Sequence, residues 1–143
     1  EDTGVKVTKD LKIGKCEKVS TGKDVTIVAI GKMVAKAVEI SKELSNQKID
    51  VEVINARFLK PFDETAVKDI LKYTNKIITV EEGSLIGGMG ESVKAVLSGT
   101  EAKICSIGLP DKFIEHGKQS LIREKCGLSV ENIEDQVLNL LNS

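Results

Sequence analysis

The chain has 143 residues, of which 41% are hydrophobic, a length and composition typical of one folded domain rather than a disordered chain. The 21 basic and 22 acidic residues leave a net charge of −1, and aromatic residues make up only 3%. We therefore expect no nucleic-acid or membrane partner, because such partners are bound through basic patches and, for single strands, through stacking aromatic side chains.

The first half of the chain alternates between strand-like and helix-like patterns. Apolar and polar residues alternate as in a half-exposed edge strand, then form a continuous β-rich run, and then repeat with the period of an amphipathic helix. Asp63 is placed to cap the N-terminus of a helix, and Pro61 makes an earlier start of that helix unfavourable. The sequence predicts strands at 11–20, 24–31 and 50–56, and helices at 32–47 and 63–74.

The second half of the chain repeats the same alternation. Its strands are short apolar runs, and its helices carry apolar residues on one face and end near Gly99 and Gly127. The sequence predicts strands at 76–82 and 102–109, and helices at 87–99, 118–126 and 130–142.

Alternating strands and helices indicate βαβ units and a largely parallel sheet. Only residues 21–24 join the first two expected strands, whereas a parallel crossover needs a dozen or more residues. The first strand is therefore expected to be antiparallel to the others. We predict an α/β fold of three αβα layers, with a five-stranded, mostly parallel sheet between helices on both faces.

The three cysteines, Cys16, Cys105 and Cys126, follow neither a CxxC nor a zinc-ligand spacing. We interpret them as free thiols, which indicates a reducing, cytoplasmic compartment. No apolar stretch approaches the roughly 20 residues that span a bilayer. Residues 1–10 lack the apolar core of a secretory signal and are interpreted as a linker that leads into a domain at 11–143.

Gly87, Gly88 and Gly90 lie between an expected strand and an expected helix, where glycines can let a phosphate approach backbone amides. A P-loop would need a lysine where Met89 stands, and the segment does not follow the GxGxxG pattern. We favour tight backbone turns as the role of these glycines, with contact to an anion or ligand as the alternative.

Charged residues follow two of the expected strands. Glu81 and Glu82 are adjacent in a strand and point to opposite faces, so they cannot easily act on one substrate. One of them is expected to cap the next helix or to pair with a base. Arg57 could bind a carboxylate or phosphate at the end of the sheet, but we favour an ion pair with Glu81 or Glu82.

His116 is the only histidine of the chain. A zinc site is not supported, because the sequence has no second histidine and no Cys or Asp at helical spacing from His116. A catalytic triad is not supported either, because the sequence has no GxSxG segment. We favour a hydrogen-bonded turn or interface residue over a catalytic one. The residues thus provide no self-sufficient catalytic set, which suits a domain that serves a larger enzyme.

Four segments of the chain resemble, in the same order, segments of the C-terminal domain of transketolase-like thiamine diphosphate enzymes. Within that group, "NARFLKP", "GGMGESV" and "GLPDKFIEHG" are most similar to 1-deoxy-D-xylulose-5-phosphate synthases. Met89 stands where many relatives have an aromatic residue, and Glu91 where a small residue is common. These two differences leave the fold assignment unchanged but make the subfamily less distinct. The resembling segments are residues 24–44, 51–64, 76–93 and 107–133.

The resemblance implies an enzyme that uses thiamine diphosphate and Mg²⁺ to condense pyruvate with glyceraldehyde 3-phosphate, for isoprenoid and thiamine biosynthesis. It places the cofactor, metal and catalytic residues in two other domains, so none is assigned in this chain, and it implies a C-terminal domain that packs on those domains and helps to build a homodimer. A separately encoded C-terminal subunit of a transketolase and a free-standing small-molecule-binding module are the alternatives. The candidate interdomain or subunit contacts are Arg57, Glu82, Gly87, Gly88, Gly90 and His116.

Overall fold

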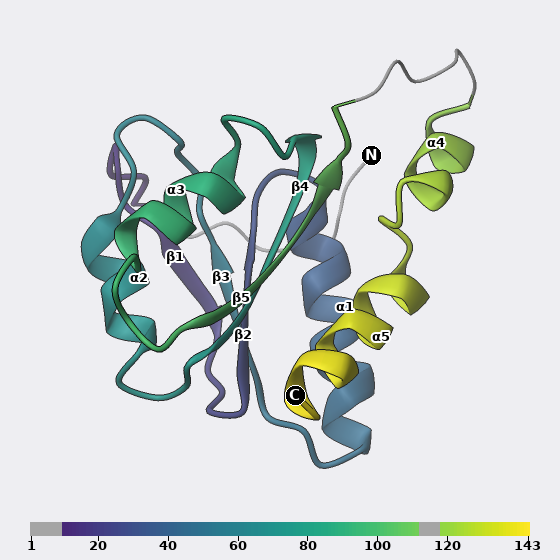
Figure 1. Cartoon of the computed structure of the whole chain (residues 1–143), viewed down its shortest axis with the longest axis horizontal. Coiled ribbons are helices and arrows are strands. Elements are labelled where there is room, and N and C mark those ends of the chain that lie inside the picture. The colour runs from purple at the N-terminus through teal and green to yellow at the C-terminus, as the bar shows by residue number, and fades with distance from the viewer. Residues whose placement is uncertain (1–9, 112–117) are drawn as a thin grey trace.

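The computed structural model describes residues 10–111 and 118–143. One mixed sheet with the strand order β1-β3-β2-β4-β5 runs through this part of the chain (Figure 1). The strands are β1 (Glu17–Ser20), β2 (Val25–Ala29), β3 (Val51–Asn55), β4 (Lys76–Ser84) and β5 (Lys103–Leu109). The helices are α1 (Met33–Asn46), α2 (Glu64–Ile70), α3 (Met89–Val96), α4 (Gln119–Lys125) and α5 (Val130–Leu141).

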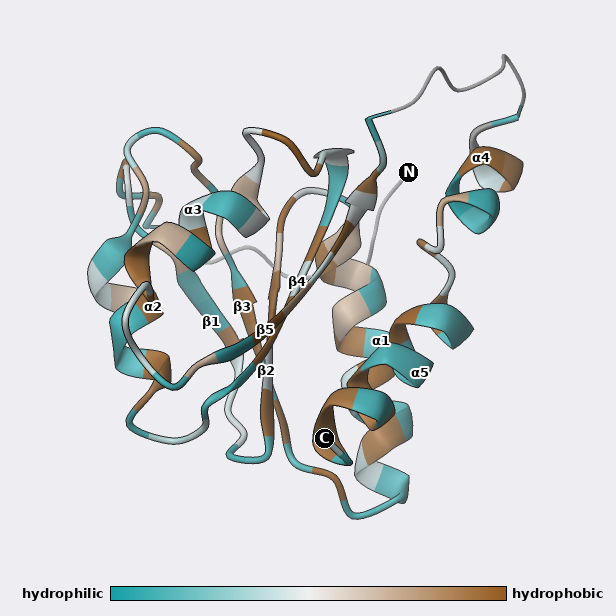
Figure 2. Ribbon diagram, in the orientation of Figure 1, coloured by the Kyte–Doolittle hydropathy of each residue, from teal (hydrophilic) through white to brown (hydrophobic). Residues whose placement is uncertain are grey.

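Helices cover both faces of the sheet, as the alternating pattern predicted. In Figure 1, α1 and α5 lie side by side on one face, and α2 and α3 lie on the other. Figure 2 shows hydrophobic residues along the central strands and both hydrophobic and hydrophilic residues on the helices, and the hydrophobic ones form two buried clusters. No helix among the described residues is both long and apolar enough to cross a membrane.

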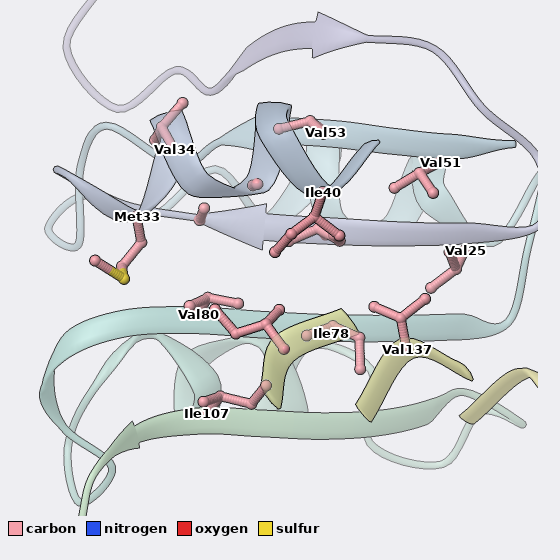
Figure 3. Close-up of a cluster of buried hydrophobic side chains, with 14 of the residues drawn as sticks. Val25, Met33, Val34, Ile40, Val51, Val53, Ile78, Val80, Ile107 and Val137 are labelled. Carbon is pink, nitrogen blue, oxygen red and sulfur yellow. The ribbon is translucent and has the colours of Figure 1, made fainter. Parts of the chain in front are cut away.

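Each face of the sheet has its own apolar core. The α1/α5 face is closed by side chains such as Ile40, Ile78 and Val137, which meet between the helices and the central strands (Figure 3). The α2/α3 face is closed by a second cluster that includes Val28 and Met89. Because apolar area removed from water is the main favourable term in folding, these two clusters give the chain a core of its own.

The direction of β1 confirms the prediction from the short link. β1 pairs antiparallel with β3, while β2, β3, β4 and β5 are mutually parallel. β1 does not lie beside β2, so the link 21–24 has to cross the start of β3. Gly22 makes that crossing possible, because a Cβ at this position would lie 2.3 Å from the backbone of Val51 and Glu52.

The predicted strand at 11–20 is too long. Only Glu17–Ser20 is a strand, and Leu11 and Ile13 lie in the preceding loop with their side chains exposed. Their apolar–polar alternation comes from a surface segment rather than from a pleated one. The other predicted elements are present, and their ends differ by a few residues; for example, α2 ends at Ile70 rather than near residue 74.

Two lysines fasten the last helix to the sheet. The Nζ of Lys76, at the start of β4, donates to the carbonyl of Leu141 at 2.8 Å, and the Nζ of Lys103, at the start of β5, donates to that of Ser143 at 3.0 Å. Cations near a helix C-terminus are favourable because the last carbonyls are unsatisfied and carry partial negative charge. α5 is thereby fixed at the amino end of the parallel strands.

Candidate functional site

The candidate residues that the structure describes gather at one end of the sheet, where the parallel strands finish: Arg57, Glu82, Gly87, Gly88 and Gly90. This region, here called the carboxyl end, contains the loop before β1, the β3–α2 loop, the end of β4 with the glycine segment, and α4 (Figure 1). In open α/β sheets, ligands and partners are usually met at this end, near the point where the strand order reverses. Here the reversal falls between β2 and β4.

Glu81 is a helix cap. Its side chain is only 2% exposed, and its carboxylate accepts hydrogen bonds from the backbone amides of Met89 at 2.9 Å and Gly90 at 3.1 Å. A carboxylate is favoured there because the first amides of α3 have no partner within the helix. The sequence prediction that one of the two glutamates caps the next helix is confirmed.

The glycines of the segment are required by close packing around that cap. A Cβ on Gly88 would lie 2.3 Å from the carbonyl oxygen of Ser84 and 2.5 Å from both carboxylate oxygens of Glu81. Gly87 has a φ of +69° and donates its N–H to the Glu91 carboxylate at 2.8 Å. These contacts support the backbone role that the sequence favoured, and an external anion would have to displace Glu81 from the N-terminus of α3.

Gly90 brings α3 close to the sheet. A Cβ at this position would lie 2.6 Å from the Ser106 hydroxyl and 2.9 Å from the Thr79 hydroxyl. Thr79 and Ser106 lie opposite each other on β4 and β5. The glycine therefore sets the distance between α3 and the two strands.

Glu82 points to the other face of the sheet and pairs with Arg123 of α4. This pair is partly exposed, with side-chain exposures of 35% for Glu82 and 23% for Arg123. The two adjacent glutamates thus serve different elements, as the alternation of side chains along a strand required. The sequence did not single out Arg123, since nothing in its local pattern indicates which strand α4 packs against.

Arg57 forms its ion pair with Glu17 at 2.6 Å, not with Glu81 or Glu82, so the predicted pairing is wrong. Both side chains are nearly buried, at 8% and 10% exposure. The reason is the strand order: β1 lies beside β3, so Glu17 is opposite Asn55 and close to Arg57. Arg57 also has a φ of +59°, and its N–H donates to the Asn55 side chain at 3.1 Å.

A small cavity of about 230 Å³ lies between α4 and the ends of β4 and β5. Apolar side chains of Leu109, Ile122 and Leu128 line it, together with three charged residues, Lys32, Glu82 and Arg123. Sequence reasoning missed this cavity, because its walls come from four separate segments.

His116 lies outside the described residues, so its predicted role stays a prediction.

Exposed large apolar side chains are concentrated at the carboxyl end. Within residues 10–111 and 118–143, six large hydrophobic side chains are exposed, and five of them lie in the loops or the helix of this end. The sixth, Tyr73, follows α2 at the opposite end. Contiguous exposed apolar patches mark interaction surfaces, and these five side chains make the carboxyl end the candidate for such a surface. The five are Leu11, Ile13, Leu59, Ile86 and Leu121.

The described residues offer no constellation for metal or thiol chemistry. No group of three or more His, Cys, Asp or Glu side chains is arranged to hold a metal ion in this part of the chain. The three cysteines are free. Burial, with the nearby Asp63 carboxylate, raises the pKa of Cys16 to about 11, and burial also raises the pKa of Cys105. Both thiols are therefore protonated and weakly nucleophilic at neutral pH.

Comparison with known proteins identifies clear relatives. The family model of the transketolase C-terminal domain matches residues 14–133. The 1-deoxy-D-xylulose-5-phosphate synthase of Desulforudis audaxviator is 40% identical over 137 residues, covering 92% of this chain and 22% of that protein. The synthase of Aquifex aeolicus is 37% identical over 135 residues, covering 93% and 22%. The chain thus spans less than a quarter of the length of these curated relatives.

Two solved structures have the same fold. A structure described as "split gene transketolase, inactive beta4 tetramer" is 34% identical, with a TM-score of 0.86 over 92% of this chain and 44% of that one. The transketolase of Campylobacter jejuni is 22% identical, with a TM-score of 0.68 over 93% of this chain and 20% of that one. The three-layer α/β architecture with an antiparallel first strand is thereby confirmed as that of transketolase-like proteins.

Proposed function

The chain belongs to the transketolase C-terminal domain family, and from this premise we propose that it is the C-terminal domain of a 1-deoxy-D-xylulose-5-phosphate synthase. The observation that carries the proposal is the similarity to such synthases, 37–40% identical over more than nine-tenths of the chain. The full enzyme would condense pyruvate with glyceraldehyde 3-phosphate and release carbon dioxide. This chain would supply a folded domain to it and no reacting group.

The domain's role is to pack against the rest of the enzyme through its carboxyl end. This is supported by the exposed apolar side chains found there, such as Ile86 and Leu59, and by the lack of such a group at the amino end among residues 10–111 and 118–143. Arg57, Glu82 and the glycine segment hold the loops that present these side chains. They act as supports of the contact surface, and His116 is proposed to belong to the same region.

The described residues do not fit thiamine diphosphate or Mg²⁺. The N-terminus of α3, which could receive a diphosphate, holds the Glu81 carboxylate, and its glycines are packed against that group. No described cluster of carboxylates and histidines matches a metal site. We propose that cofactor and metal are bound by the parts of the synthase that lie outside this chain.

Assembly and location follow from the same proposal. The solved relative described as a β4 tetramer and the length of the curated relatives support partner domains or subunits, and we propose a homodimer for the full enzyme. The three free cysteines support a reducing, cytoplasmic compartment.

A separately encoded C-terminal subunit of a transketolase is the second candidate. The 34% identity and TM-score of 0.86 to a split-gene transketolase favour it. The two candidates differ in donor substrate, since a transketolase takes a two-carbon unit from a ketose phosphate and the synthase takes it from pyruvate. A free-standing module that binds a phosphate at the glycine segment is disfavoured, because Glu81 already occupies the α3 amides.

One assay tests the proposal and separates the candidates. The chain alone and the full-length polypeptide that contains it are each given thiamine diphosphate and Mg²⁺, with either pyruvate and glyceraldehyde 3-phosphate or xylulose 5-phosphate and ribose 5-phosphate as substrates. We expect carbon dioxide release from pyruvate by the full-length polypeptide and no turnover by the chain alone. Turnover by the isolated chain would contradict the proposal. An inactive full-length polypeptide that uses the ketose, and not pyruvate, once a partner subunit is added would favour the transketolase subunit.

A further inference from the structure

We propose that the cavity beneath α4 is an anchor pocket, which takes one large apolar side chain, with a carboxylate beside it, from the part of the synthase outside this chain. The inference rests on the proposed function and specifies where the contact is made. The partner is thus a polypeptide segment of stated chemistry: a bulky apolar residue next to an aspartate or glutamate.

The cavity has the size and the walls for such a side chain. Its volume is about 230 Å³, and Leu109, Ile122 and Leu128 line it. An apolar cavity of roughly 150 Å³ is known to hold a benzene ring, so this one has room for one aromatic or branched aliphatic side chain. Leu128 is fully buried, while Leu109 and Ile122 are partly exposed. The cavity therefore has a closed floor and an accessible opening.

The charges around the cavity call for an acidic neighbour. Arg123 and Glu82 pair with each other, and Lys32 is exposed and takes part in none of the ion pairs found among the described residues. The three charges sum to one positive charge. A carboxylate that arrives next to the apolar side chain would pair with Lys32 and would leave the Glu82–Arg123 pair intact.

The pocket is held open by contacts that fix α4 and the turn after it. Arg123 joins α4 to Glu82 of β4. The N–H of Leu128 donates to the carbonyl of Arg123 at 2.8 Å, and the Nζ of Lys36 in α1 donates to the carbonyl of Leu128 at 2.5 Å. A preformed pocket requires little ordering on binding, which is typical of the positions that dominate interface energies.

The rest of the polypeptide is a better occupant than a small molecule. The curated relatives are more than four times as long as the matched region, so most of such a protein lies outside this chain. Leu121, which precedes Ile122 on α4, is 53% exposed, so the helix that borders the cavity also carries an apolar side chain in solvent. A small ligand would leave that side chain in water, whereas a polypeptide segment would cover both.

The pocket is tested by filling it in the full-length polypeptide. Ile122→Trp places a large side chain in the cavity, and Leu71→Trp places the same side chain in the larger hollow that Leu71 lines at the amino end. The readout is the rate at which limited trypsin digestion releases this domain. We expect Ile122→Trp to speed release at least about tenfold and Leu71→Trp to leave it within about twofold.

A charge reversal gives the second variant pair. Lys32→Glu at the cavity is expected to speed release by about fivefold, while Lys23→Glu, an exposed lysine of the amino-end hollow, should have no effect. If neither Ile122→Trp nor Lys32→Glu changes release while Ile86→Asp does, the carboxyl end is the contact surface but the anchor pocket is wrong. If Ile86→Asp is also silent, the docking proposal itself fails.

Two controls on the isolated chain identify other occupants. A large loss of thermal stability in the isolated Ile122→Trp chain would mean that the cavity belongs to the chain's own packing. Self-association of the isolated chain in sedimentation, abolished by Ile122→Trp, would mean that a second copy fills it. Either result would overturn the proposal, which expects a stable monomer in both cases.

Discussion

The two ends of the parallel sheet are built differently. At the amino end, the chain closes upon itself: the link 21–24 crosses β3 at Gly22, and Lys76 and Lys103 hold the end of α5. The one large apolar side chain exposed there among the described residues, Tyr73, lies under the Lys18 ammonium at 5.1 Å from its ring centre. The hollow at this end is lined mainly by polar side chains.

At the carboxyl end, internal contacts instead hold loops whose apolar side chains face outward. Glu81 and Arg57 are nearly buried and fix the glycine segment and the β3–α2 loop, while Ile86 and Leu59 remain exposed. At the amino end, charged side chains therefore hold the chain's own elements together. At the carboxyl end, they hold loops whose apolar side chains are exposed. This difference also suggests substitutions that should affect folding and assembly separately.

The largest effect on folding is expected at the amino end, from Gly22→Ala. Because the new Cβ would overlap the backbone of Val51, which cannot turn aside as a side chain can, we expect a loss of about 3 kcal/mol. Urea denaturation of the isolated chain measures it. Gly99→Ala is the matched control: its Cβ would meet open space, and only the positive φ of +79° should cost about 1 kcal/mol. Equal losses would refute the tight crossing.

The next effect separates the two adjacent glutamates. Glu81→Ala leaves the amides of Met89 and Gly90 buried without their acceptor, and we expect a loss of about 2 kcal/mol in the free energy of unfolding. Glu82→Ala removes a partly exposed ion pair and should cost less than about 1 kcal/mol. Both are measured by urea denaturation of the isolated chain, and the reverse order would show that Glu81 is not the structural cap.

The smallest effect in energy compares the exposed apolar residues of the two ends. Ile86→Asp should leave the isolated chain stable, because Ile86 is 62% exposed, but should weaken docking in the full-length polypeptide by about tenfold. Trypsin release of the domain, and the activity proposed for the full-length polypeptide, measure it. Tyr73→Asp, 58% exposed at the amino end, should change neither. A stronger effect of Tyr73→Asp would reverse the assignment of the two ends.

The sequence predicted the fold well because each element has its own period. The continuous run of β2 and the 3.6-residue period of α1 need only local information, and the direction of β1 followed from the length of one link. The strand at 11–20 was overextended, because the apolar residues Leu11 and Ile13, which read as pleated, lie on the exposed surface of a loop. Alternation alone does not distinguish a strand from such a surface.

The site was predicted only as far as local geometry reaches. The separation of Glu81 from Glu82 followed from their adjacency in a strand, and the cap at α3 from the next helix start. The partner of Arg57 could not be predicted in this way, because the pairing depends on β1 lying beside β3, which no local pattern specifies. Arg123 and the cavity were missed for the same reason.

Hydrogen–deuterium exchange tests most directly whether the carboxyl end is the contact surface. The isolated chain and the full-length polypeptide are compared peptide by peptide, since amides covered by a partner exchange more slowly. We expect slower exchange in the full-length form for residues 57–62, 84–88 and 118–125, and equal exchange for 21–24 and 71–75. Slower exchange at the amino-end peptides, with no change at the carboxyl end, would contradict the account.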